Sequence, residues 1–266
     1  MPALVTKRDD ASNWRMLPVS YDSCFMNLAL EEALARTNCS KDSQHRTTVR
    51  FWRNPNSVVL GRFQEAETEV DLEECKLSQV QVARRFTGGG TVFQDEGTLN
   101  FTILRKPSGN TTALKFQEGN LRLVLEALGN LGLDCSISAP NSILAGGRKL
   151  CGAAAALGKK FALWHCSIMV TTNTRLLERV LGPSKARANT RFVHSKWSPV
   201  TTVTKELSKS VNTDDVERTL RTVVQDEFSV ELETSSLSVE EEECSKALLA
   251  RKYSSEEWNL YGNRRA

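Results

Sequence analysis

The chain has 266 residues, a length that allows one large domain with a full hydrophobic core. Its 35 basic and 32 acidic side chains leave a net charge of +3, too balanced for the dense basic face that non-specific nucleic-acid binding needs. Hydrophobic residues make up 40% of the chain, but no apolar run approaches the roughly 20 residues that span a bilayer. We therefore expect a globular protein that binds neither nucleic acid nor membrane.

The N-terminal segment and the cysteines indicate the compartment. Residues 1–15 lack the apolar core of a secretory signal, and their two aspartates argue against a transit peptide. Seven cysteines, an odd number with no C-x-x-C pair, fit a reducing compartment better than a disulfide framework. The expected location is the cytoplasm.

The first hundred residues combine β-patterns with one helical pattern. A helix is expected from about Phe25 to Ala35, capped by Asp22 or Ser23, because its apolar residues recur at helical spacing. The acidic segment 65–74 is typical of a solvated helix or loop. Alternating or β-branched stretches predict strands at 14–20, 48–52, 57–60, 80–85, 91–93 and 99–104.

The second half continues with a helix that ends near Leu131, at Gly132, and then a strand at 135–137 and a hairpin over 143–150. A strand over 161–170 places His165 on one face and Trp164 on the other. Next come a short helix at 176–181 and a basic loop at 183–200, which could close over a ligand. The C-terminal part is expected to form a helix capped by Thr213 or Asp214, a strand at 229–232, and a helix with a capping box of Ser238 and Glu241.

The stretch RRFTGGGTVFQDEGTLNF, residues 84–101, carries the strongest chemical signal. Three consecutive glycines let backbone N–H groups approach a bound anion, and the neighbouring Arg85 offers a charged fork for phosphate or carboxylate. The pattern suggests a cradle for a phosphorylated or acyl-adenylated ligand. A glycine-rich turn with solvated arginines remains an alternative from the residues alone.

A second group of polar residues follows at Asn141 and in GGRKLCGAAAA, residues 146–156. Lys149, flanked by small residues in a predicted strand, could reach a cleft and stabilise charge on a phosphate or acyl carbonyl. An ordinary hairpin lysine is the alternative. Other sites are disfavoured: the three histidines lack metal-site spacing, and neither a G-x-S-x-G elbow nor a G-x-G-x-x-G loop is present.

Six segments together resemble the lipoate–protein ligase catalytic domain of the biotin/lipoyl protein ligase family. They occur in the family's order, between about residues 14 and 260: FMNLALEEAL, VRFWRNPNSVVLGRFQ, ARRFTGGGTVFQDEGTLNF, NSILAGGRKLCGAA, LWHCSIMV and RKYSSEEWN. The biotin-ligase branch is less similar, since RRFTGGG stands where that branch has a GRGRxGR-type loop. The resemblance implies an α/β (α+β) fold with a large mixed, mostly antiparallel sheet, a small second sheet and flanking helices. It also implies one catalytic domain over residues 1–266, with a helical portion at about 210–260.

The resemblance further implies an enzyme that uses ATP and Mg²⁺ to convert lipoate to lipoyl-AMP, and then transfers lipoyl to a lysine of a lipoyl domain. The acceptors would be of the 2-oxoacid dehydrogenase E2 or glycine cleavage H protein type. Lys149 would be the catalytic lysine, and an apolar tunnel between the VVLG and TVF strands would hold the acyl chain. The residues that would line the adenylate cleft are Arg85, Thr87, Gly88, Gly89, Gly90, Val92, Gln94, Asn100, Asn141, Gly152 and His165.

Two positions depart from the family pattern. The usual VFHD is VFQD, and Gln94 can donate and accept hydrogen bonds but cannot take up a proton near neutral pH. The usual Asn-Asp pair is Asn141-Ser142, which removes a carboxylate that could help to hold magnesium. The chain also ends soon after the last motif, so we expect a small accessory subunit encoded separately.

Two other functions stay open at this point. A cysteine-dependent octanoyl or lipoyl transferase of the same fold would need a reactive thiolate near Lys149, and Cys135 is the candidate, because Cys151 and Cys166 are expected on the opposite strand faces. A non-catalytic homologue that only binds the acyl group or the carrier domain is the other alternative.

Overall fold

A computed structural model describes residues 14–38, 47–107, 112–181 and 192–262. Its centre is an eight-stranded mixed sheet in the order β11-β1-β2-β6-β10-β9-β8-β7. The pairs β11–β1 and β1–β2 are parallel, and the others are antiparallel. The strands are β1 Trp14–Leu17, β2 Thr47–Trp52, β6 Thr98–Arg105, β7 Cys135–Ser138, β8 Ser142–Ala145, β9 Arg148–Leu157, β10 Ala162–Met169 and β11 Glu233–Thr234.

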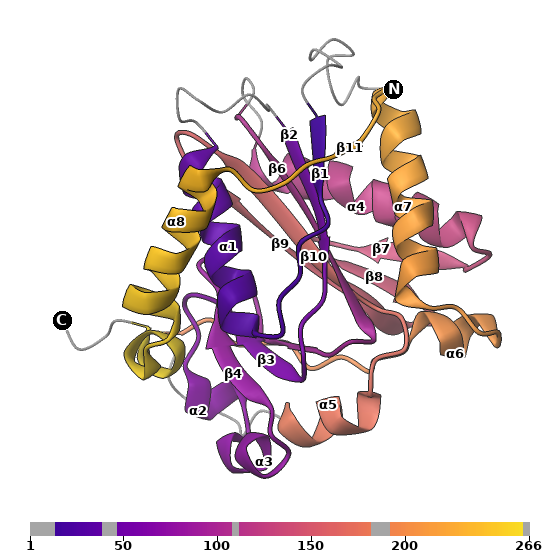
Figure 1. Ribbon diagram of the computed structural model, residues 1–266. Helices are drawn as coiled ribbons and strands as arrows, with labels where there is room; N and C mark the ends of the chain where they lie inside the picture. The colour runs from indigo at the N-terminus through magenta and orange to yellow at the C-terminus, as the bar shows by residue number, and fades with distance from the viewer. Residues whose placement is uncertain (1–13, 39–46, 108–111, 182–191, 263–266) are drawn as a thin grey trace.

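A three-stranded sheet in the order β4-β3-β5 lies below the large sheet in the view of Figure 1. It consists of β3 Ser57–Leu60, β4 Gln81–Arg84 and β5 Val92–Gln94. Three short helices accompany it: α2 Ala66–Glu69, α3 Leu72–Leu77 and α5 Thr174–Val180. The two sheets confirm the fold that the resemblance implied.

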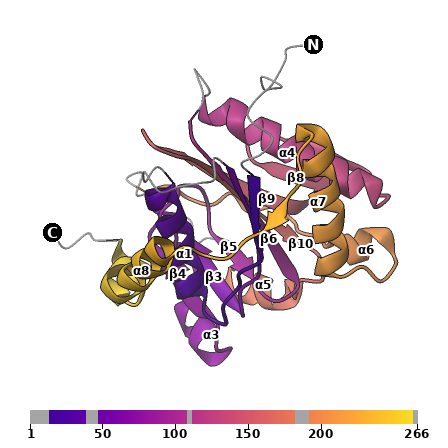
Figure 2. The same cartoon turned by 45° about the horizontal axis from the view of Figure 1, so that its top comes forward.

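Helices cover both faces of the large sheet, as Figures 1 and 2 show from two directions. Helices α4 (Ala113–Asn130) and α7 (Thr213–Phe228) bury the main core against one face, and α6 (Val203–Leu207) lies beside them. Helices α1 (Cys24–Thr37) and α8 (Val239–Leu248) lie on the other side. Strand alternation divides the residues: Phe101, Trp164 and Cys166 face the main core, whereas Asn100, His165 and Ser167 face the opposite way.

The C-terminal motif acts as a structural clamp. The chain continues through two π-helical turns, Leu249–Tyr253 and Glu257–Tyr261. The buried Arg84 guanidinium donates to the carbonyls of Trp258 (3.0 Å) and Leu260 (2.9 Å), and also to the carbonyl of Gln64 (2.6 Å). One arginine next to the glycine triplet therefore ties the C-terminal segment to the small sheet.

Two expectations for the C-terminal part were wrong. The strand expected at 229–232 lies at Glu233–Thr234, because the ladder forms where these residues pair with Arg15 and Met16 of β1. Ser229 instead adopts a left-handed conformation that ends α7. The cap of α7 is Asn212, which exchanges hydrogen bonds with Asp215 in a capping box. The capping box of Ser238 and Glu241 is confirmed.

Several boundaries also shifted. The acidic segment, expected to be a solvated helix or loop, forms two short helices, because Asp71 caps a new helix at Leu72. It is also less solvated than expected, since Ala66, Thr68 and Glu69 of α2 are buried against the small sheet and its neighbours. Ser23 rather than Asp22 caps α1. No helix in the described residues is long and apolar enough to cross a membrane.

Candidate active site

A cavity of about 600 Å³, here called cavity 1, lies between the large sheet, the small sheet and the glycine loop (residues 87–91). Its floor is the face of the large sheet that α4 and α7 leave uncovered. Ten of the twelve predicted site residues line it: Arg85, Gly89, Gly90, Val92, Gln94, Asn100, Asn141, Lys149, Gly152 and His165. Thr87 and Gly88, the other two, contact Arg85 beneath the loop. The structure thus brings together segments that are far apart in the sequence.

Lys149 reaches cavity 1 because of an irregularity in β9. Ile143 pairs with Cys151 and Leu144 pairs with Lys149, so that Leu150 is an extra residue in β9. Leu150 and Cys151 both turn into the main core, while Lys149 and Gly152 both line the cavity. Without the bulge, Lys149 and Cys151 would share one face of the strand.

The ammonium of Lys149 lies over Gly152. A Cβ atom placed on Gly152 would come within 3.1 Å of Lys149 Nζ, so that glycine provides the space for this side chain. The ammonium forms no hydrogen bond or ion pair with any residue that the structure describes. Burial lowers the pKa of Lys149; the nearby Cys151 acts in the opposite direction, and the charge of Arg85 lowers it further. Lys149 is thus a partly desolvated cation that is available to a ligand.

Arg85 binds the glycine loop from beneath. Its guanidinium donates to the carbonyls of Gly88 (2.6 Å), Gly90 (2.7 Å) and Val59 (3.1 Å), and its Nε donates to Thr87 Oγ1 (3.0 Å). The sequence suggested a free fork for phosphate, whereas these bonds give the side chain a positioning role. Burial lowers the pKa of Arg85 to about 10; Glu31 opposes this shift, and Arg84 adds to it.

Gly89 completes the loop with a φ of 92°, a backbone conformation that side chains other than glycine rarely adopt. A Cβ there would also come within 2.9 Å of the Arg85 guanidinium. Gly89 is therefore required by the shape of the loop and by the arginine beneath it.

Glu31 of α1 is a site residue that the sequence analysis missed. Its carboxylate contacts His165 Nδ1 at 2.7 Å, and His165 Nε2 lies 3.0 Å from Thr87 Oγ1. Burial alone would raise the pKa of Glu31, but the charges of His165 and Arg50 and the hydrogen bonds from His165 and Thr102 lower it. Glu31 is thus held as a carboxylate that orients His165. The two glutamates in FMNLALEEAL were the available signal, since a carboxylate on the buried face of a helix needs a partner.

Gln94 belongs to an uncharged network. Its Oε1 accepts from Asn54 Nδ2 (2.6 Å), and its Nε2 donates to Asn100 Oδ1 (2.7 Å) and Ser167 Oγ (2.7 Å). Gln94 is 3% exposed, and both ends of its amide are hydrogen-bonded. The glutamine therefore suits its site as an amide that both accepts and donates.

The segment 192–200, called the strap, runs over the cavity from the glycine loop to Lys149. Ser195 Oγ accepts from the Thr91 amide (2.9 Å) and from Gln64 Nε2 (3.0 Å). At the other end, the Lys149 amide donates to the Pro199 carbonyl (2.7 Å). The expected loop at 183–200 is irregular in its described part; residues 183–191 lie outside the described residues, and its closure over a ligand stays a prediction.

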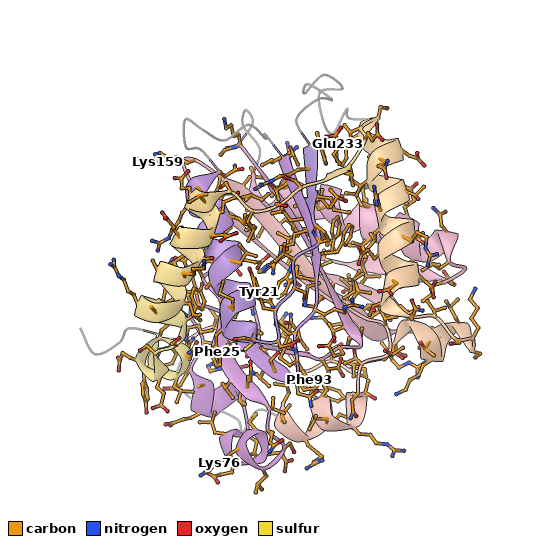
Figure 3. All side chains as sticks on the ribbon, in the orientation of Figure 1. Tyr21, Phe25, Lys76, Phe93, Lys159 and Glu233 are labelled. Carbon is orange, nitrogen blue, oxygen red and sulfur yellow. The ribbon has the colours of Figure 1, made fainter. Side chains whose placement is uncertain are left out.

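A second hollow of about 290 Å³, cavity 2, shares Lys149, Gly152 and strap residues with cavity 1. Its apolar walls include Phe93, Met169 and Trp197. Figure 3 shows Phe93 above α5, where the small sheet and that helix meet. Lys149 therefore lies where the two cavities join.

The carboxylates and cysteines near the cavities limit which reactions the site can support. No carboxylate is among the described residues that line cavity 1, and the described residues contain no cluster of three or more His, Cys, Asp or Glu that could hold a metal. Cys135 is half-buried and lines neither cavity, and burial, Asp134 and other neighbours raise its pKa to about 11. Burial also raises the pKa of Cys166 well above its ordinary value. A thiolate nucleophile next to Lys149 is thus not supported by the cysteines that the structure describes.

Comparisons with known proteins agree with this geometry. Residues 23–225 match the family model of the lipoyl protein ligase A/B catalytic domain. The lipoate–protein ligase A subunit 1 of Thermoplasma acidophilum is 33% identical over 245 residues, which cover 88% of this chain and 91% of that protein. The lipoate–protein ligase A of Bdellovibrio bacteriovorus is 30% identical, and the match covers 90% of this chain but 69% of that protein.

Solved structures show the same similarity. A chain from the bi-partite lipoate protein ligase of T. acidophilum matches with a TM-score of 0.81 and 29% identity over 93% of this chain and 96% of that one. A lipoate–protein ligase A bound with ATP matches with a TM-score of 0.81 and 32% identity over 93% of this chain and 98% of that one. The chain belongs to the lipoyl protein ligase A/B catalytic domain family.

Proposed function

We propose that this chain is a lipoate–protein ligase, which uses ATP to convert lipoate to lipoyl-AMP and transfers the lipoyl group to a lysine of a lipoyl domain. The observation that carries the proposal is the ammonium of Lys149, which lies without an ion-pair partner among the described residues where cavities 1 and 2 join. In a mixed anhydride of lipoate and AMP, the reacting oxygens lie at the centre of the molecule. The acyl chain extends from that centre in one direction and the nucleoside in the other. A bent acyl-adenylate therefore suits this arrangement.

The linings of the two cavities support one orientation of that ligand. The inner end of cavity 1 is formed by Leu28, Trp52 and Val59, each at most 3% exposed, and suits an uncharged acyl chain. Cavity 2 has flat or flexible apolar walls at Phe93, Met169 and Trp197, and suits a purine. The phosphate then lies beside Lys149, close to the strap.

In the first half-reaction, an oxygen of the lipoate carboxylate attacks the α-phosphorus of ATP. The bond from that phosphorus to the bridging oxygen breaks, and pyrophosphate leaves with its electron pair. Lys149 stabilises the negative charge that builds up on the phosphoryl oxygens. The glycine loop is fixed by Arg85, which donates to the carbonyls of Gly88 and Gly90, and its Gly89 and Gly90 line the same region without Cβ atoms.

In the second half-reaction, a neutral lysine amine of the acceptor attacks the acyl carbonyl. The carbon–oxygen bond to phosphate breaks, AMP leaves, and the amine releases a proton to solvent. Lys149 again faces the oxygens that gain charge, so the same residue serves both steps. His165, oriented by Glu31, lies deeper in the cavity and shapes the acyl site.

The described lining of cavity 1 offers Mg²⁺ no carboxylate, and that of cavity 2 offers only Glu69 and Glu178, which belong to no cluster of three or more metal-ligating side chains among the described residues. We place Mg²⁺ with ATP as the counterion of its phosphates, and no step depends on a protein-held metal.

The acceptor is a lipoyl domain of the E2 or H-protein type. The T. acidophilum relative is named as subunit 1 and its structure as part of a bi-partite ligase, which supports a separate accessory subunit here. We place the reaction in the cytoplasm, since the six described cysteines are all free.

Mass spectrometry of an acceptor lipoyl domain tests the proposal. The domain is incubated with this chain, ATP, magnesium and lipoate, with and without a candidate accessory subunit. We expect a mass increase of one lipoyl group that requires ATP and is lost in Lys149→Ala. Tight binding of lipoyl-AMP without any transfer would instead assign the chain to a non-catalytic homologue.

A further inference from the structure

A chain of buried amide side chains runs from α1 to the floor of cavity 1. Asn27 Nδ2 donates to Asn54 Oδ1 (2.8 Å), and Asn54 Nδ2 donates to Gln94 Oε1 (2.6 Å). Gln94 Nε2 then donates to Asn100 Oδ1 (2.7 Å). All four residues are at most 3% exposed. Each amide accepts through its oxygen and donates through its nitrogen, so the chain has one direction.

Arg50 sets that direction. Its guanidinium donates to Asn27 Oδ1 at 2.9 Å, and the backbone amide of Tyr21 donates to the same oxygen at 3.0 Å. A guanidinium cannot accept a hydrogen bond, so the oxygen of Asn27 must face it. If the oxygen and nitrogen of the Asn54, Gln94 or Asn100 amide were exchanged, two donors or two acceptors would face each other at that point of the chain. Linked hydrogen bonds also polarise one another, which strengthens the last donor in the series.

The last donor is the Nδ2 group of Asn100. The oxygen of this amide is occupied, because it accepts from Gln94 and also from Ser167 Oγ at 2.7 Å. The nitrogen is buried and has no hydrogen-bond partner among the residues that the structure describes, and Asn100 lines cavity 1. A buried amide N–H without a partner is unfavourable, so a ligand that supplies an acceptor there binds more tightly.

Sheet register locates this donor along the ligand. Asn100 pairs with Ser167, and Ser167 pairs with Gly152, over which Lys149 Nζ lies. Two strand spacings separate Asn100 from Gly152 by about 10 Å, which is too far for Asn100 and Lys149 to share one oxygen. On the other side Asn100 pairs with Trp52, at the apolar end of the cavity. Asn100 therefore faces the distal part of the acyl chain.

We propose that Asn100 is a specificity-determining residue that donates from Nδ2 to a sulfur of the dithiolane ring. The inference rests on the proposed function and specifies its acyl substrate. The first ring sulfur lies six bonds from the carboxyl carbon, on the order of 8 Å at about 1.3 Å of extended length per bond, which matches the position of Asn100. Octanoate has only methylene and methyl groups there and leaves the donor unsatisfied. The chain accordingly prefers lipoate to octanoate.

The test is a competition between lipoate and octanoate, read by mass spectrometry of the acceptor domain. Asn100→Leu keeps the approximate size of the side chain and removes the donor. We expect the ratio of lipoyl to octanoyl product to fall at least five-fold relative to the wild type. Since both acyl groups compete for the same enzyme molecules, loss of folded protein cancels from the ratio. An unchanged ratio in Asn100→Leu overturns the inference.

Gln94→Glu tests the directional chain without changing Asn100. A carboxylate at this position has no donor for Asn100 Oδ1 and accepts from Nδ2, so the Asn100 amide turns and presents its oxygen to the cavity. The ratio should fall about as far as in Asn100→Leu; a ratio as high as in the wild type would contradict the assigned direction. The matched control is Asn120→Leu, since Asn120 is 5% exposed in α4, on the far side of the large sheet.

The outcomes separate this inference from the proposed function. A wild-type chain that transfers neither acyl group overturns both. A wild-type chain that lipoylates the acceptor, with a product ratio unaffected by Asn100→Leu, overturns the specificity role alone. A drop in the ratio that Asn120→Leu reproduces would also overturn it, because the effect would then not require the loss of a donor in cavity 1.

Discussion

One inserted residue decides where Lys149 points. The pattern of small residues around GRKLCG indicated a strand lysine that could reach a cleft, and the resemblance gave it a role. The bulge at Leu150 could not be predicted, because it depends on the pairing of β8 with β9. Likewise, the sequence placed Arg85 at the site but could not show that its guanidinium donors are directed to the loop carbonyls.

Gly152→Ala tests the space that the lysine occupies. The new Cβ would lie 3.0 Å from Lys149 Cε and 3.1 Å from Nζ, so the ammonium must move. We expect kcat/KM for lipoylation to fall by about ten-fold, less than the roughly 100-fold that a 1 Å misplacement of a catalytic group can cause, because the end of the lysine must shift by only a few tenths of an ångström. Gly119→Ala in α4, where a Cβ meets nothing within 4 Å, is the control and should leave activity unchanged. Full activity of Gly152→Ala would show that the observed lysine position is not the productive one.

The lowered pKa of Lys149 predicts an effect on stability with a definite sign. In the window between the lowered folded pKa and the ordinary lysine value, the unfolded chain binds more protons than the folded chain. Stability contributed by this group therefore rises with pH across that window. In Lys149→Met the free energy of unfolding should no longer rise with pH across this window. At pH 7 it should equal or exceed that of the wild type, although the variant loses activity. Urea unfolding at a series of pH values from 7 up to 10.5, the ordinary lysine value, measures this slope, and a variant clearly destabilised at pH 7 would mean that the lysine supports the fold.

At the scale of elements, alternation and helix caps predicted most strands and helices, including the face of β10 that carries His165. The predictions failed where contacts between distant segments determine the position of a strand, a helix cap or a buried side chain. Pairing with β1 moved β11 to Glu233–Thr234, and Asn212 caps α7 through its exchange with Asp215. Glu31 was missed because its partners, His165 and Arg50, come from strands distant in the sequence.

The contact between α1 and β10 predicts a pH-dependent role for Glu31. Its pKa is lowered in the folded chain, so its contribution to stability is present at neutral pH and is lost as the pH falls through the folded pKa. Glu31→Gln should cost about 2 kcal/mol at pH 7, a value typical of losing buried hydrogen bonds to a charged group, and less in acid. The measurement is denaturant unfolding from pH 7 to pH 3.

The control for Glu31→Gln is Glu118→Gln, which removes an exposed pair with Arg122 in α4. That change should cost less than about 1 kcal/mol at every pH. A Glu31→Gln variant as stable as the wild type at pH 7 would contradict the ionic link between α1 and the sheet.

At the scale of the whole molecule, the site is assembled from both sheets, α1, the glycine loop and the strap, and it joins two cavities at one lysine. The T. acidophilum relative is called a subunit, and this chain covers 69% of the longer Bdellovibrio ligase. We therefore expect the two half-reactions to differ: formation of lipoyl-AMP from ATP and lipoate should require the accessory subunit, whereas transfer from preformed lipoyl-AMP should not. Rapid pyrophosphate release by the isolated chain would contradict this division.

The most direct test of the central claim is transfer from synthetic lipoyl-AMP to an acceptor lipoyl domain, followed by intact mass spectrometry. It isolates the step in which Lys149 acts on the acyl carbonyl and needs neither ATP nor a partner. The account predicts modification of a single acceptor lysine by the wild-type chain, and a rate at least about 100-fold lower with Lys149→Ala at equal binding of lipoyl-AMP. Equal rates for the two proteins would contradict the role of Lys149.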